Sequence, residues 1–178
     1  TDHRPPPRRR CRPRPQLRLP PHATHLLALL SPGRVAAAAS ATSKKRLLEA
    51  LARMLADGQG DATESAVFDS LCARERLGST GLGHGVAIPH GRTAGLGTAT
   101  GAFLRLAEPV DFGAPDGQPV DLIFALAVPE HFTHQHLLLL SQLAEMFGDE
   151  GFRERLRTAG DAPSLYRLLS EWQSSEAA

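Results

Sequence analysis

Long apolar runs are missing from this chain of 178 residues, and it has only two cysteines. No apolar stretch is long enough to span a bilayer, which argues against membrane insertion. Cys11 and Cys72 lie far apart in the sequence, so we expect no disulfide framework and a reducing, cytoplasmic environment. The N-terminal arginines are not followed by the apolar segment and cleavage site of a secretory signal.

A strong excess of charge is also missing, because the formal net charge is +1. Residues 1–21 nevertheless hold seven arginines and one aspartate, a net charge of +6, which leaves −5 for the rest of the chain. The same segment holds seven of the fourteen prolines, so we expect residues 1–24 to form a disordered Arg/Pro-rich tail. A basic arm for nucleic acid or membranes is the alternative for this tail. The acidic remainder argues against nucleic acid as the main partner.

The remaining sequence alternates between helical and strand patterns. Helices are expected over residues 44–56, 63–73, 133–147, 151–158 and 164–172, with Ser43 as the cap of the first and Thr63 as the cap of the second. In the helix at 133–147 we expect the core-facing side to consist of Leu137, Leu140, Leu143, Ala144 and Phe147. Strands are expected over 34–38, 86–88, 99–106 and 120–128. The last strand is almost entirely apolar, so we expect it to be central and buried on both faces. The fold class is therefore α/β, a mixed β-sheet with helices on both faces. A single domain is expected over residues 25–173, followed by a short tail at 174–178.

The glycine-rich segment GSTGLGHGVAIPHGR, residues 78–92, carries the main functional signal. We expect its apolar residues 86–88 to form a short strand that Pro89, which lacks an N–H group, brings to an end. His90 would then lie at the carboxyl end of that strand, with the Arg92 guanidinium nearby. Imidazole is nucleophilic near neutral pH, and arginine and backbone N–H groups bind phosphate, so the pattern favours phosphoryl transfer. A structural histidine in a turn is the alternative.

Residues 79–91 resemble the signature of the mannitol/fructose-type (type 2) enzyme IIA domains of the bacterial phosphotransferase system, and most of all the nitrogen-regulatory IIA proteins. The resemblance extends over residues 26–172. It implies that His90 is the phosphorylated residue, that a histidine-containing phosphocarrier protein is the donor, and that no metal or cofactor is needed. It also implies regulatory targets such as kinases or transporters. The relatives often carry Asn where this chain has His84.

Further residues are expected around the phosphoryl group. The resemblance implies that His136 is a second active-site histidine that hydrogen-bonds the phosphoryl oxygens, with His134 as the alternative in this register. It also implies that Arg74 binds phosphate, the alternative being a solvated charge at a helix end. The hydroxyl groups of Ser79 and Thr80 are further candidates for phosphate binding, or they satisfy the turn.

Three functions stay open from the sequence. The first is a regulatory phosphocarrier, the second a sugar-specific IIA component that passes phosphate to a IIB domain and then to fructose or mannitol, and the third a non-catalytic binding module. For a phosphocarrier, we expect an apolar rim that includes Phe132 and Leu82 to bind the donor protein.

A metal site is the remaining reading of the histidines at positions 84, 90, 131, 134 and 136. His134 and His136 are two residues apart, and this spacing does not place them on one face of a helix. Both cysteines lie outside the cluster. The sequence therefore disfavours a metal centre.

Overall fold

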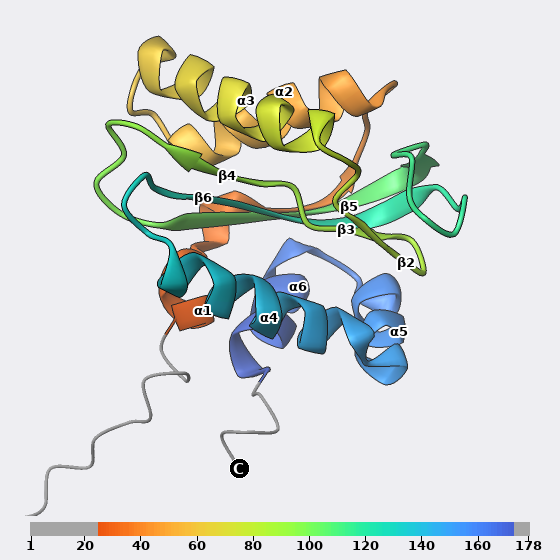
Figure 1. Cartoon of the computed structure of the whole chain (residues 1–178). Helices are drawn as coiled ribbons and strands as arrows, with labels where there is room; N and C mark the ends of the chain where they lie inside the picture. The colour runs from red at the N-terminus through yellow and green to blue at the C-terminus, as the bar shows by residue number, and fades with distance from the viewer. Residues whose placement is uncertain (1–24, 173–178) are drawn as a thin grey trace, which may run out of the picture.

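A six-stranded mixed sheet forms the middle layer of the computed structural model, which describes residues 25–172 (Figure 1). The strands are β1 Val35–Ala39, β2 Gly81–Gly83, β3 Val86–Ala87, β4 His90–Thr93, β5 Thr100–Val110 and β6 Val120–Pro129. Their order is β1-β5-β6-β3-β2, and β4 also pairs with β6. β6 is antiparallel to β5 and parallel to β3 and β4. The predicted tails at 1–24 and 174–178 lie outside the described residues.

Helices cover both faces of this sheet. They are α1 His25–Leu29, α2 Lys44–Ala56, α3 Asp61–Arg76, α4 His134–Gly148, α5 Glu150–Thr158 and α6 Ala162–Glu171, with a 3₁₀ turn, η1, at Pro32–Arg34. Figure 1 shows α2 and α3 on one face and α1, α4, α5 and α6 on the other. The predicted α/β class, with helices on both faces of a mixed sheet, is confirmed. Within residues 25–172, no helix combines the length and the apolar character needed to cross a membrane.

Strand β6 divides the hydrophobic core into two halves. Leu122, Phe124 and Leu126 belong to the core on the side of α4, α5 and α6. Ile123 and Ala125 belong to the core under α2 and α3. Because successive strand side chains point to opposite faces, one apolar run fills both cores. The prediction of a central strand buried on both faces is confirmed.

The expected start of α2 is confirmed, whereas that of α3 is wrong. The Ser43 hydroxyl accepts a hydrogen bond from the N–H of Arg46 at 3.2 Å, as an N-cap serine does. α3 begins at Asp61 with Gly60 as its N-cap, so Thr63 lies inside the first turn and does not cap the helix. An acidic residue in the first turn stabilises the helix dipole, and Asp61 supplies that charge without a capping side chain.

The inward face of α4 differs in part from the expected one. Leu143 and Phe147 are buried as expected, whereas Leu137 is 66% exposed and Ala144 is also exposed. His136 and Leu139 are buried instead. Residues 137–140 are four consecutive leucines, so the sequence fits more than one apolar stripe. Packing of α4 on the sheet selects the stripe that contains His136 and turns this histidine toward β4.

β3 ends at Ala87, just before Pro89, as expected, but a further strand that the sequence did not predict, β4, begins at His90. Val86 pairs with Leu122 in β3, and His90 pairs with Leu126 in β4, so the chain resumes in the same register along β6. The carbonyl of Pro89 accepts a hydrogen bond from the N–H of Leu126 at 2.9 Å. Proline lacks only the donor, so the ladder is interrupted locally. His90 therefore follows the end of β3, as expected, and is also the first residue of β4 within the sheet.

Candidate functional site

A cleft of about 390 Å³ lies between the end of α3, β4 and the start of α4. Its lining residues are Ser70, Ala73, Arg74, Leu77, His90, Gly91, Arg92, Glu130 and His136. The cleft brings together His90, His136, Arg74 and Arg92 from the residues that the sequence singled out. Ser79 and Thr80 do not line it.

His90 is held in one tautomer by the backbone. Its Nδ1 lies 2.7 Å from the carbonyl oxygen of Ile88. A carbonyl only accepts hydrogen bonds, so Nδ1 carries the proton and Nε2 keeps its lone pair. Burial, followed by the charge of Arg74, lowers the pKa of His90 and keeps the ring neutral near pH 7. A Cβ at Gly91 would lie 2.8 Å from the Cβ of Ser70, so only glycine lets α3 pack this closely beside His90.

His136 faces His90 across the cleft. The two rings meet edge to face, with centroids 5.2 Å apart. The Nε2 atom of His136 is buried and has no hydrogen-bond partner, so it is available for a hydrogen bond with a bound group. Burial first, then the charges of His90 and Arg92, lower the pKa of His136 to about 4. His134 is exposed and does not line the cleft.

Acid is expected to destabilise the fold through His136. Its pKa falls from 6.5 in the unfolded chain to about 4 in the folded one, so the unfolded chain binds more protons in this range. Stability is complete above the unfolded pKa and is lost as the pH falls toward the folded pKa. Linkage gives a loss of about 2 kcal/mol between about pH 7.5 and about pH 5. Urea unfolding at both pH values measures it, and His136→Gln should lose less on acidification. An equal loss in this variant would assign the acid sensitivity to other groups.

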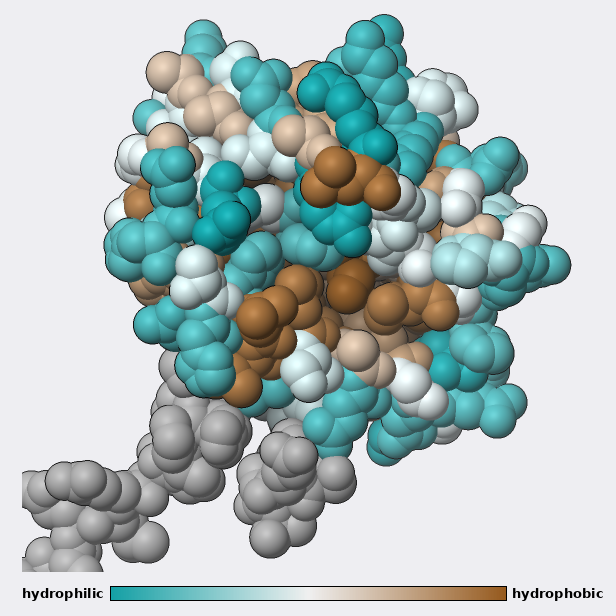
Figure 2. All heavy atoms as spheres, in the orientation of Figure 1, coloured by the Kyte–Doolittle hydropathy of each residue, from teal (hydrophilic) through white to brown (hydrophobic). Residues whose placement is uncertain are grey.

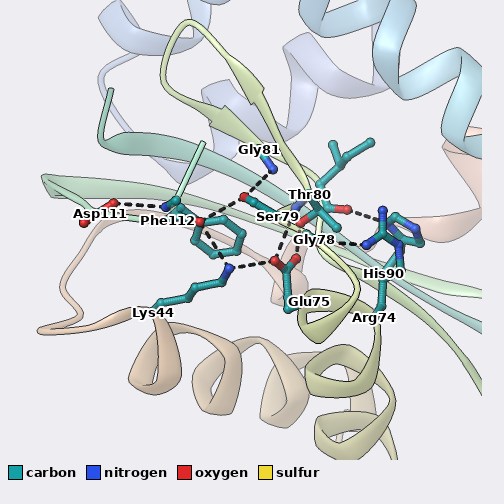
Figure 3. Close-up of polar contacts among 12 residues, drawn as sticks. Lys44, Arg74, Glu75, Gly78, Ser79, Thr80, Gly81, His90, Asp111 and Phe112 are labelled. Atoms are coloured by element: carbon teal, nitrogen blue, oxygen red, sulfur yellow. Dashed lines mark hydrogen bonds and ion pairs between the residues drawn. The ribbon is translucent and has the colours of Figure 1, made fainter. Parts of the chain in front are cut away.

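Two arginines make the cleft suitable for an anion. Arg74, from the last turn of α3, lies beside His90 in Figure 3 and donates from Nη1 to the carbonyl of Gly78 at 2.8 Å. Arg92, from β4, is exposed and contributes to the lowered pKa of His136. Guanidinium groups bind phosphate through paired N–H donors, so the cleft offers such donors from two separate elements.

The hydroxyl groups of Ser79 and Thr80 form hydrogen bonds outside the cleft, within the structure that holds the glycine-rich loop. Ser79 Oγ donates to the carbonyl of Phe112 at 2.9 Å, and Thr80 Oγ1 donates to the carboxylate of Glu75. Their role as phosphate ligands stays a prediction, and the structure gives both hydroxyls a part in holding the loop. The sequence analysis assigned no role to Glu75. Its position directly after Arg74 was the one signal in the sequence that could have identified it.

Exposed apolar side chains flank the cleft. Leu77 lines it and is 84% exposed, and Leu137, which follows His136, is 66% exposed. Figure 2 shows apolar atoms gathered on this side of the molecule, between α3 and α4. Phe132, expected in the rim, instead lines a separate cavity of about 620 Å³ beside α1. Leu82 is 41% exposed on β2.

A metal centre finds no support in the side-chain arrangement. Among residues 25–172, no group of three or more His, Cys, Asp or Glu side chains is placed to hold a metal ion.

Comparison with known proteins gives a consistent result. The family described as "Phosphoenolpyruvate-dependent sugar phosphotransferase system, EIIA 2" matches residues 28–172. A nitrogen regulatory protein of Pseudomonas aeruginosa is 45% identical over 83% of this chain and 96% of its own length. A fructose-specific EIIA component of Haloferax volcanii is 34% identical over 72% of this chain and 84% of its own.

A solved structure agrees with these sequence matches. The crystal structure of the nitrogen regulatory protein IIA-Ntr from Neisseria meningitidis superposes with a TM-score of 0.75 at 46% identity, covering 81% of this chain and 98% of that one. The family match, over residues 28–172, begins within α1 and extends past the end of α6, so it includes every residue that lines the cleft. The chain therefore belongs to the EIIA type 2 family of the phosphoenolpyruvate-dependent sugar phosphotransferase system.

Proposed function

We propose that this chain is a regulatory phosphocarrier that accepts a phosphoryl group on Nε2 of His90 from a phosphohistidine donor protein. The observation that carries the proposal is the pairing of two histidines in one cleft. His90 presents an unprotonated Nε2, and His136 presents a buried Nε2 without a partner.

The transfer is a single in-line displacement. The lone pair on Nε2 of His90 forms a bond to phosphorus as the bond from phosphorus to the donor's imidazole nitrogen breaks, and that nitrogen takes the electron pair. The Nδ1–H of His90 stays bonded to the Ile88 carbonyl, which stabilises the positive charge that develops on the ring. Arg74 and Arg92 balance the phosphoryl charge, and neutral His136 donates from Nε2 to a phosphoryl oxygen. These steps require no metal or cofactor.

The donor that fits this chemistry is a histidine-containing phosphocarrier protein. Its phosphohistidine must reach His90, which is 8% exposed at the base of the cleft. Leu77 and Leu137 give this donor an apolar contact surface beside the cleft. A relay needs rapid release, so we expect a small interface.

A regulatory role is favoured over sugar transport by the relatives. The nitrogen regulatory proteins of Pseudomonas aeruginosa and Neisseria meningitidis are 45% and 46% identical to this chain, compared with 34% for the fructose-specific component. Downstream partners would then be regulatory targets such as kinases or transporters. Under the sugar-specific alternative, a IIB domain would take the phosphoryl group from His90 and pass it to fructose or mannitol.

Incubation with a phosphorylated donor protein tests the proposal. We expect one phosphoryl group per chain, labile in acid and stable in base, with ³¹P and ¹⁵N NMR placing it on Nε2. The Nδ1 isomer would contradict the tautomer that Ile88 imposes, and no incorporation would contradict the carrier function in favour of a binding module. Adding a IIB domain and fructose or mannitol to the phosphorylated chain distinguishes the regulatory role from the sugar-specific one. Sugar phosphate is expected to form only if the chain is a sugar-specific IIA component.

A further inference from the structure

Glu75 is a buried carboxylate directly beside Arg74 in the sequence. Figure 3 shows the two side chains diverging, Arg74 toward His90 and Glu75 toward Lys44 and Thr80. The Glu75 side chain is 6% exposed, and its oxygens contact Lys44 Nζ at 2.8 Å, the Thr80 N–H at 3.2 Å and the Thr80 hydroxyl. Burying a carboxylate is costly, and a buried ion pair adds little net stability. What these contacts do fix is the position of Thr80.

Thr80 connects Glu75 to the reacting histidine. The carbonyl of Thr80 accepts a hydrogen bond from the N–H of Ile88 at 3.1 Å. The carbonyl of Ile88 in turn holds Nδ1 of His90 at 2.7 Å. A shift of Thr80 would therefore move the carbonyl that sets both the tautomer and the orientation of His90.

A second connection runs from Glu75 to Arg74 through the loop. Gly78, two residues before Thr80, accepts a hydrogen bond from Arg74 Nη1 at 2.8 Å. Holding Thr80 restricts Gly78, because only one residue separates them. The carbonyl of Gly78 can then keep the Arg74 guanidinium at the edge of the cleft.

Lys44, the ion-pair partner of Glu75, is itself held by Phe112. Lys44 Nζ donates to the carbonyl of Phe112 at 3.1 Å and lies 4.3 Å from the centre of its ring. Ser79 Oγ donates to the same carbonyl at 2.9 Å. The glycine-rich loop is thus tied through Glu75 and Ser79 to α2 and to the segment after β5.

We propose that Glu75 is a positioning residue for phosphoryl transfer, whose carboxylate holds the glycine-rich loop and thereby orients both His90 and Arg74. The proposal rests on the proposed phosphocarrier function. In this proposal the Glu75 carboxylate holds the glycine-rich loop from outside the cleft, and it does not touch the phosphoryl group.

The charge of Glu75 gives this role an independent signature. It raises the pKa of His90, against burial and the charge of Arg74, which lower it. The other charged or titratable groups at the cleft are Arg92 of β4, His136 of α4, and Glu130. Removing the Glu75 charge takes away one of the effects that raise the pKa of His90 and leaves burial and the Arg74 charge to lower it, so this pKa should fall further.

Three variants test the proposal against Glu64→Gln, a control in the same helix that alters a partly exposed ion pair with Arg53. Glu75→Ala removes the anchor, Glu75→Gln keeps a hydrogen-bonding group without the charge, and Thr80→Val removes only the hydroxyl contact. The maximal transfer rate should fall by about 10²-fold in Glu75→Ala, since small misplacements of reacting groups cost that much. Glu75→Gln should recover part of the rate, and Thr80→Val should show an intermediate loss. The donor concentration for half-maximal rate should stay unchanged, because Glu75 is buried away from the donor.

Titration of the His90 ring by NMR completes the test without any donor. We expect a lower pKa of His90 in Glu75→Gln than in the wild type and in Glu64→Gln. Wild-type rates and an unshifted His90 pKa in the Glu75 variants would overturn the positioning role. Reduced stability with an unchanged rate per folded molecule would also overturn it. If the wild type accepts no phosphoryl group, the carrier function fails instead, and the NMR titration still reports on Glu75.

Discussion

Phosphoryl incorporation from a phosphorylated donor is expected to vanish in His90→Ala. Nε2 of His90 keeps a free lone pair, because Nδ1 is bonded to the Ile88 carbonyl, and it lies in a cleft that is also lined by two arginines. His136 cannot replace it, because the Ile88 carbonyl orients only His90. The loss should therefore reach the detection limit of a radiolabel assay. His90→Gln, which keeps a polar side chain, repeats the test if the alanine variant is unstable.

The matched control for this experiment is His84→Asn in the same glycine-rich segment. His84 is exposed and has a positive φ of 55°, a conformation that Asn adopts more easily than Ala. This variant should accept phosphate as the wild type does. Full labelling of His90→Ala, or loss of labelling in His84→Asn alone, would assign the acceptor to another histidine.

Removal of the second histidine is expected to have the next largest effect. His136→Ala deletes the buried Nε2 that has no partner in the structure and lies beside the reacting ring. Losing one preorganised donor to a transition-state oxygen costs about 10²- to 10³-fold in rate, so rapid-quench transfer kinetics should show a loss of that order. His136→Gln, whose amide can donate, should lose less.

His134→Ala is the control that decides between the two histidines. Its ring is exposed outside the cleft, so the transfer rate should remain that of the wild type. A rate that falls in His134→Ala and not in His136→Ala would reverse the assignment.

The sequence predicted those parts of the fold for which a local pattern favours one type of secondary structure. The almost entirely apolar run at 120–128 favoured a strand buried on both faces, and Ser43 before an amphipathic stretch favoured a helix start. The glycine-rich motif made His90 a candidate through its local chemistry, and the resemblance to the enzyme IIA signature implied that His90 is the phosphorylated residue. Local patterns sufficed for the strand and the helix, whereas the role of His90 also needed the resemblance.

The tertiary structure decided which side chains meet. Four consecutive leucines left the face of α4 undetermined, and only packing on the sheet turned His136 inward and Leu137 outward. Pro89 would end an isolated strand, yet β6 continues the register through the Pro89 carbonyl and keeps His90 within the sheet. Ser79 and Thr80 were polar residues beside the motif, and long-range contacts directed their hydroxyls to Phe112 and Glu75. Side-chain identity is local information, whereas the partner of a polar group depends on elements distant in sequence, and only the folded chain brings those together.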